Sequence, residues 1–192
     1  LILPALAAIA VLAHDIVSLL YGSTWLQAVP AVPWLCLAYA ISSLFTLSAP
    51  VLTGVGKPYA AIGPNALLVV AKVACAVWLM NGTLGTFALA MALGQLLSVP
   101  YNLWIHARYL NLGWATWARS TIPVLAQALL VGGVCLSIRE ALPVSLTPLA
   151  AILVTSCSAL VTFLASCFLL SLPMADELMR MQKTLLQRRQ KT

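Results

Sequence analysis

Charged residues are almost missing from six long stretches of this chain. A helix that crosses a lipid bilayer needs about 20 mostly apolar residues, and each of the six stretches meets that length. They cover residues 1–20, 31–53, 61–80, 84–106, 118–138 and 146–172. Charged residues make up 7% of the whole chain, against about 25% in soluble domains. The sequence therefore predicts an all-α membrane protein, a bundle of six transmembrane helices.

Glycine and proline mark the breaks between the spans. The first two spans form a predicted hairpin, turning at Tyr21-Gly22 and stopping at Gly56-Lys57-Pro58. Asn81-Gly82 separates the third span from the fourth, and Glu140 to Pro143 separates the fifth from the sixth. Only the connection at residues 107–117 is long.

These boundaries divide the chain into four parts. Residues 1–106 form a four-helix core, 107–117 a cytoplasmic loop, 118–172 a transmembrane pair, and 173–192 a basic amphipathic tail. The tail suits a helix lying on an anionic leaflet, and equally a solvated end. Because the chain starts inside an apolar run at Leu1, without an initiator Met, we expect it to be the C-terminal part of a longer protein.

The basic residues predict the orientation. With six spans both ends lie on one side, and eight of the ten basic residues fall there: Lys57, Arg108, Arg119, Arg180, Lys183, Arg188, Arg189 and Lys191. Arg139 falls on the other side and Lys72 inside a span. The positive-inside rule makes both ends cytoplasmic. The net charge of +6 therefore indicates which side of the membrane the loops face. It does not indicate nucleic-acid binding.

Polar side chains recur along the third and fourth spans. Lys72 lies near the middle of the third span, where a charge costs roughly 2.5 to 3.5 kcal/mol. Asn65 shares its helical face, and Gln95, Asn102 and His106 follow one face of the fourth span. These stripes predict a polar cavity between two helices, with a cation at its centre that attracts an anion. Alternatively, Lys72 pairs or snorkels, and the amides hold the bundle together.

His14 and Asp15 are ionisable residues in the first span, near its periplasmic end. Carboxylates within spans often serve proton or ion relays, so Asp15 is a candidate coupling site for H⁺ or Na⁺, with His14 tuning it. Asp15 is equally a candidate counter-charge for Lys72, or part of a wetted helix end.

Other chemistry finds little support. The sequence holds no acidic pair, no phosphate-binding glycine loop and no metal-ligand spacing. The five cysteines are scattered singly and suit small buried apolar residues. We therefore expect no cofactor, no metal and no enzymatic activity.

The hairpin and the next two spans contain several short motifs, which occur in one order along the chain. They are Leu19-Leu20-Tyr21-Gly22, Trp25, Ala28, Gly56-Lys57-Pro58 and the run Gly82-Thr83-Leu84-Gly85-Thr86-Phe87-Ala88-Leu89-Ala90. In this order, between about Pro4 and Arg108, the sequence resembles the C-terminal half of the bacterial polysaccharide and oligosaccharide flippases, the Wzx-type members of the MOP exporter superfamily.

The resemblance implies two lobes of about twelve to fourteen spans in total, around a central cavity in the bacterial inner membrane. Its partners would be membrane lipids, a first lobe of the same protein, and an undecaprenyl-diphosphate-linked oligosaccharide. Such proteins flip that repeat unit for O-antigen, capsule or exopolysaccharide synthesis. Lys72 is our candidate contact for the diphosphate, on the grounds of its depth and charge.

Three other functions stay open. One is a multidrug exporter of the same superfamily, although Lys72 would repel cationic drugs. Another is a membrane-embedded sugar polymerase or ligase, although such enzymes usually need a sizeable periplasmic loop. The last is a purely structural bundle.

Overall fold

The computed structural model describes residues 2–79, 82–110, 113–142 and 148–169, and this part of the chain contains helices and no strand. The α-helices are α1 (Ile2–Val11), α2 (Ala13–Tyr21), α3 (Val32–Ser43), α4 (Ser48–Gly54), α5 (Ile62–Leu79), α6 (Leu84–Leu110), α7 (Trp114–Ala141) and α8 (Pro148–Leu169). Two 3₁₀ helices, η1 (Ser23–Ala31) and η2 (Pro58–Ala61), precede α3 and α5.

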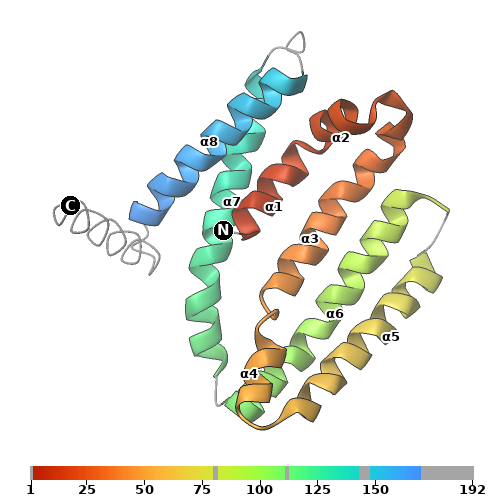
Figure 1. Ribbon diagram of the computed structural model, residues 1–192, viewed down its shortest axis with the longest axis vertical. Helices are drawn as coiled ribbons and strands as arrows, with labels where there is room; N and C mark the ends of the chain where they lie inside the picture. The colour runs from red at the N-terminus through yellow and green to blue at the C-terminus, as the bar shows by residue number, and fades with distance from the viewer. Residues whose placement is uncertain (1, 80–81, 111–112, 143–147, 170–192) are drawn as a thin grey trace, which may run out of the picture.

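The long helices lie side by side in a row (Figure 1). The order along the row is α8, α7, α1, α3, α6 and α5, and each of these helices packs against the next. The short helix α1 therefore joins the α7–α8 pair to the other helices. Large apolar side chains such as Val77, Trp78 and Leu129 remain exposed on the helices, as expected of a protein that faces lipid.

Five of the helical segments are long and apolar enough to cross a membrane, and a bent pair makes a sixth if it counts as one span. The five are Ser23–Gly54, Pro58–Leu79, Leu84–Leu110, Trp114–Ala141 and Leu149–Cys167. The predicted all-helical class is thus confirmed for the described residues, and each of the six predicted segments contains helix, although a turn at residues 44–47 interrupts the second.

The first predicted span, 1–20, is not one straight helix. α1 and α2 meet at Leu12 with a bend of 73°. The ten residues of α1 rise only about 15 Å, half of a hydrocarbon core of about 30 Å. The bend allows α2 to pack against α8 and η1 instead of continuing along α7.

The predicted turns lie where glycine has a left-handed backbone. Gly22, Gly56 and Gly82 all have φ close to +75°, a conformation that costs other residues a steric penalty. Asn81, Pro143 and the tail at 173–192 lie outside the described residues. The predicted long loop at 107–117 is wrong, because α6 continues to Leu110 and α7 already begins at Trp114.

Four of the five basic residues of the described part fall at two opposite ends, and the fifth, Lys72, lies within α5. α6 ends and α7 begins at the end of the molecule where α4 and the start of α5 also lie (Figure 1). Lys57, Arg108 and Arg119 belong to these segments, whereas Arg139 lies near the other end of α7. This arrangement agrees with the charge distribution from which we predicted the orientation.

The α7–α8 pair is held by one buried amide and a small apolar core. The Gln127 side chain donates to Ser166 Oγ at 2.9 Å and to Cys167 Sγ at 3.2 Å. Val131 and Phe163 lie in the core beside it and contact Ala8 of α1. This core is thus one of the contacts that attach the pair to the rest of the molecule.

Candidate functional site

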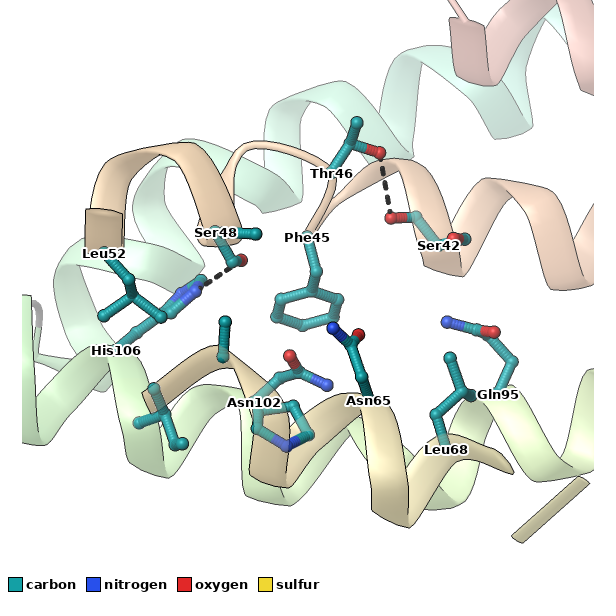
Figure 2. A pocket seen from close by; sticks show the side chains of 14 residues that line it. Ser42, Phe45, Thr46, Ser48, Leu52, Asn65, Leu68, Gln95, Asn102 and His106 are labelled. Atoms are coloured by element: carbon teal, nitrogen blue, oxygen red, sulfur yellow. Dashed lines mark hydrogen bonds between the residues drawn. The ribbon is translucent and has the colours of Figure 1, made fainter. Parts of the chain in front are cut away.

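A polar cavity of about 270 Å³ lies where α3, α4, α5 and α6 meet (Figure 2). Its lining residues are Ser42, Phe45, Thr46, Ser48, Ala49, Leu52, Ala61, Pro64, Asn65, Leu68, Gln95, Asn102, Ile105 and His106. The two polar stripes predicted from the sequence therefore meet in one place, because the spacing of their residues puts them on facing sides of α5 and α6.

Three amide side chains approach the cavity from α5 and α6 (Figure 2). Gln95 is 4% exposed, whereas Asn65 is exposed at the rim. Asn102 donates from Nδ2 to the carbonyl oxygen of Ser98 at 3.0 Å, which leaves its Oδ1 as an acceptor. No side-chain hydrogen bond holds the Gln95 or Asn65 amide within the described part of the chain. These amides are therefore available to a bound molecule.

His106 forms the far wall of the cavity and is 8% exposed. Its Nε2 lies 2.6 Å from Ser48 Oγ, so one of these two groups donates to the other. Its Nδ1 is buried and has no hydrogen-bond partner among the described residues. A buried polar atom without a partner is costly, and Nδ1 is closed off from the cavity, so His106 contributes its ring and its bond to Ser48 to the lining.

The break between α3 and α4 places Ser48 opposite His106. α3 ends at Ser43, a turn follows through Leu47, and α4 begins at Ser48. Hydroxyl groups bond back to the backbone around the turn, as Ser43 Oγ does to the Ala40 carbonyl oxygen at 2.8 Å. Such bonds compete with helical hydrogen bonds and favour a bend.

Aromatic rings connect this turn to two other helices. The ring of Phe45 lies 5.7 Å from that of His106 and is stacked on Trp117 of α7 at 6.0 Å. Phe45 therefore forms one wall of the cavity and also links it to the start of α7. No sequence pattern distinguishes Phe45 or Ser48 as a functional residue, because both lie inside an apolar run.

Lys72 is not among the residues that line the cavity, so the predicted cation at its centre is wrong. A Cβ on Gly94 would lie 2.7 Å from the Cα of Lys72. α5 and α6 thus touch at this point, and the cavity closes before it reaches Lys72. The side chain is half-buried and forms no ion pair with any described residue.

Asp15 pairs with Arg139 and not with Lys72. Arg139 Nε donates to Asp15 Oδ2 at 2.7 Å, and Nη2 donates to Oδ1 at 3.0 Å. The Asp15 side chain is 5% exposed and that of Arg139 is 32% exposed. His14 Nδ1 lies 3.9 Å from Asp15 Oδ1 on an exposed side chain. Of the alternatives weighed for Asp15, the structure favours a counter-charge role, with Arg139 as the partner.

The chemistry of the cavity is that of neutral hydrogen bonding. Among the described residues, no group of three His, Cys, Asp or Glu side chains is placed to hold a metal ion. No Asp, Glu, Lys or Arg of the described ranges lines the cavity. The arrangement is therefore suited to binding an uncharged polar group.

No family model, no curated protein and no solved structure matches the chain.

Proposed function

We propose that this chain is part of a membrane transporter that flips undecaprenyl-diphosphate-linked oligosaccharide repeat units across the bacterial inner membrane. The observation that carries the proposal is the polar cavity of α3 to α6 inside an otherwise apolar row of helices. The resemblance of the hairpin motifs to Wzx-type flippases adds to it. In this proposal a second lobe completes the path, and both ends of the chain face the cytoplasm.

A polar cavity favours flipping because it lowers the free-energy cost of moving polar groups through the hydrocarbon core. Moving one hydroxyl or amide group into hydrocarbon without a hydrogen bond costs roughly 4 to 8 kcal/mol, and an oligosaccharide carries many hydroxyl groups. Side chains such as Gln95, Asn102 and His106 replace part of the hydration that the sugar loses. Cargo without polar groups would gain nothing from such a lining.

Lys72 remains our candidate for the diphosphate. It lies four residues after Leu68, which lines the cavity, and thus about 6 Å further along α5. Its ammonium group has no counter-charge within the described part of the chain. An anion next to the cavity would supply that charge. Asp15 is a weaker candidate for ion coupling, since its carboxylate is already paired.

The proposal is tested by deleting the full-length gene and restoring it. We expect the deletion strain to lose its surface polysaccharide and to accumulate lipid-linked repeat units, while its drug-resistance profile stays unchanged. Normal polysaccharide in the deletion strain would remove the proposal. Altered drug resistance with normal polysaccharide would favour the multidrug exporter instead.

Lys72→Ala tests the diphosphate contact, with Lys57→Ala as the matched control, because Lys57 is an exposed lysine in a turn. We expect Lys72→Ala to reduce the restored polysaccharide about tenfold, the effect of about 1.4 kcal/mol, and Lys57→Ala to restore it fully. Equal restoration by both variants would exclude Lys72 from the mechanism.

A further inference from the structure

We infer that the cavity of α3 to α6 binds one uncharged sugar residue, and that charged groups of a ligand stay outside it. The inference rests on the proposed function in naming a sugar as the ligand. It goes further by assigning the sugar to a pocket within this row of helices and by separating it from the site for phosphate.

The first argument is charge. Of the fourteen residues that line the cavity, His106 is the only one with an ionisable side chain. A phosphate placed there would have no arginine or lysine to pair with, and a cationic drug would have no carboxylate. Burying an unpaired charge is far more costly than burying an uncharged polar group. The lining therefore selects against both kinds of ion.

The second argument is the type of hydrogen bond on offer. The amides of Gln95 and Asn65 each present donors and an acceptor. Asn102 adds its Oδ1 as an acceptor, because only its Nδ2 is bonded within α6. A hydroxyl group both donates and accepts, so it satisfies amide donors and amide acceptors alike. Sugars carry several such groups at close spacing.

The third argument is the combination of polar and apolar walls. Phe45 presents its ring between the amides and His106 (Figure 2), and Leu52, Pro64 and Leu68 complete the apolar part of the lining. Ligand pockets typically combine an apolar wall with a few placed polar groups. A sugar ring matches this pattern, because its hydroxyl groups lie around the edge and its C–H groups on the faces.

The fourth argument is size. A volume of about 270 Å³ lies just below the range of about 300 to 1,000 Å³ that is usual for ligand pockets. It admits one sugar residue and excludes a whole repeat unit. The same space would hold about nine water molecules at the density of the liquid, so water is the rival occupant.

The inference is tested by saturation-transfer NMR on the full-length protein in lipid nanodiscs. The probes are N-acetylglucosamine, glucose and galactose, and the last two are each compared with the corresponding uronate, which carries its charge on the sugar itself. We expect transfer to at least one neutral sugar and about tenfold weaker transfer to the uronates. No transfer to any neutral sugar, or equal transfer to the uronates, would overturn the inference and leave water as the occupant.

Variants locate the site. His106→Phe and Gln95→Leu keep the volume of the side chain and remove its hydrogen bonds, and we expect each to lower the affinity for the sugar about tenfold. The matched control is Gln27→Leu, at an exposed residue away from the cavity, and it should bind as the natural protein does. Equal loss in the variants and the control would contradict the site.

A variant that fills the cavity keeps the inference testable if the polar variants fail to fold. Leu68→Trp places a larger apolar side chain in the cavity without removing any polar group, and the unfolding temperature of every variant is measured alongside. A folded Leu68→Trp protein that binds sugar normally would overturn the inference even if the polar variants failed to fold.

The two experiments distinguish a failure of the sugar-binding inference from a failure of the proposed flippase function. If no sugar enters the cavity while the deletion strain still accumulates lipid-linked repeat units, the protein is a flippase whose sugar contacts lie elsewhere. If sugar binds and the deletion strain has normal polysaccharide, the pocket is correct and the transported molecule is another sugar-bearing compound.

Discussion

Asp15 and Arg139 show how one pair of residues can join distant parts of a membrane protein. The two are 124 positions apart in the chain, and their double hydrogen bond connects α2 to the end of α7. A carboxylate that is 5% exposed depends on its partner, because an uncompensated charge cannot be solvated there.

We expect Arg139→Met to destabilise the full-length protein by about 3 kcal/mol, near the low end for a buried pair because Arg139 keeps some contact with solvent. Asp15→Asn should cost less, since it leaves the more exposed partner unpaired. The double variant Asp15→Asn with Arg139→Met should regain most of the loss. The measurement is thermal unfolding in detergent.

Glu140→Gln is the control for this pair. Glu140 is an exposed neighbour of Arg139, and its replacement should leave the unfolding temperature unchanged. If the double variant were as unstable as Arg139→Met, the pairing would not be what stabilises the α2–α7 contact. A loss of transport by Asp15→Asn without a loss of stability would revive the coupling role.

At the scale of the helices, two close contacts determine how tightly α5 packs against α6. A Cβ on Gly94 would meet the backbone of Lys72 at 2.7 Å, and one on Gly63 would meet the hydroxyl of Tyr101 at 2.7 Å. Small residues let helix backbones approach in membranes, where packing replaces the hydrophobic effect between helices. The Gly94 contact also marks where the cavity ends, so it separates Lys72 from the polar groups.

Gly94→Ala should destabilise the protein by about 1 to 3 kcal/mol, because the added methyl group meets backbone that cannot move aside. Gly133→Ala is the matched control. Gly133 is an exposed glycine within α7, and a Cβ there would meet nothing within 4 Å. It should be neutral or stabilising by up to about 1 kcal/mol. Thermal unfolding that is no earlier for Gly94→Ala than for Gly133→Ala would contradict the close packing.

At the scale of the whole molecule, the row of helices has two ends of different charge. Lys57, Arg108 and Arg119 belong to segments at one end, and η1 begins at the other (Figure 1). The positive-inside rule predicts that the first end faces the cytoplasm. This orientation would open the α4 side of the cavity toward the cytoplasmic leaflet, where lipid-linked repeat units would be collected.

Single cysteines in a cysteine-free background test the orientation. Ser23→Cys and Lys57→Cys replace exposed residues at opposite ends. We expect a membrane-impermeant thiol reagent to label Ser23→Cys in cells with a permeable outer membrane, and Lys57→Cys only after the inner membrane is opened. Thr116→Cys, at the start of α7, should behave as Lys57→Cys does. The reverse pattern would invert the topology and move the cavity to the periplasmic side.

The sequence by itself determined the apolar segments, the glycine turns and the two polar stripes. Apolar length defines a span, glycine between two apolar runs indicates a turn, and helical spacing puts Asn65 on α5 and Gln95 and Asn102 on α6 where they can meet. These are local properties of the chain, so periodicity and composition are enough to predict them.

Only the tertiary structure decided the bend at Leu12, the partner of Asp15, the bond between Ser48 and His106, and the position of Lys72 outside the cavity. In a membrane protein the faces toward lipid and toward other helices are both apolar, so the hydrophobic pattern does not tell how a helix is rotated or what it touches. Ser48 and His106 are 58 residues apart, and their contact depends on how α4 packs against α6. A close approach of two backbones at Gly94 likewise exists only once both helices are in place.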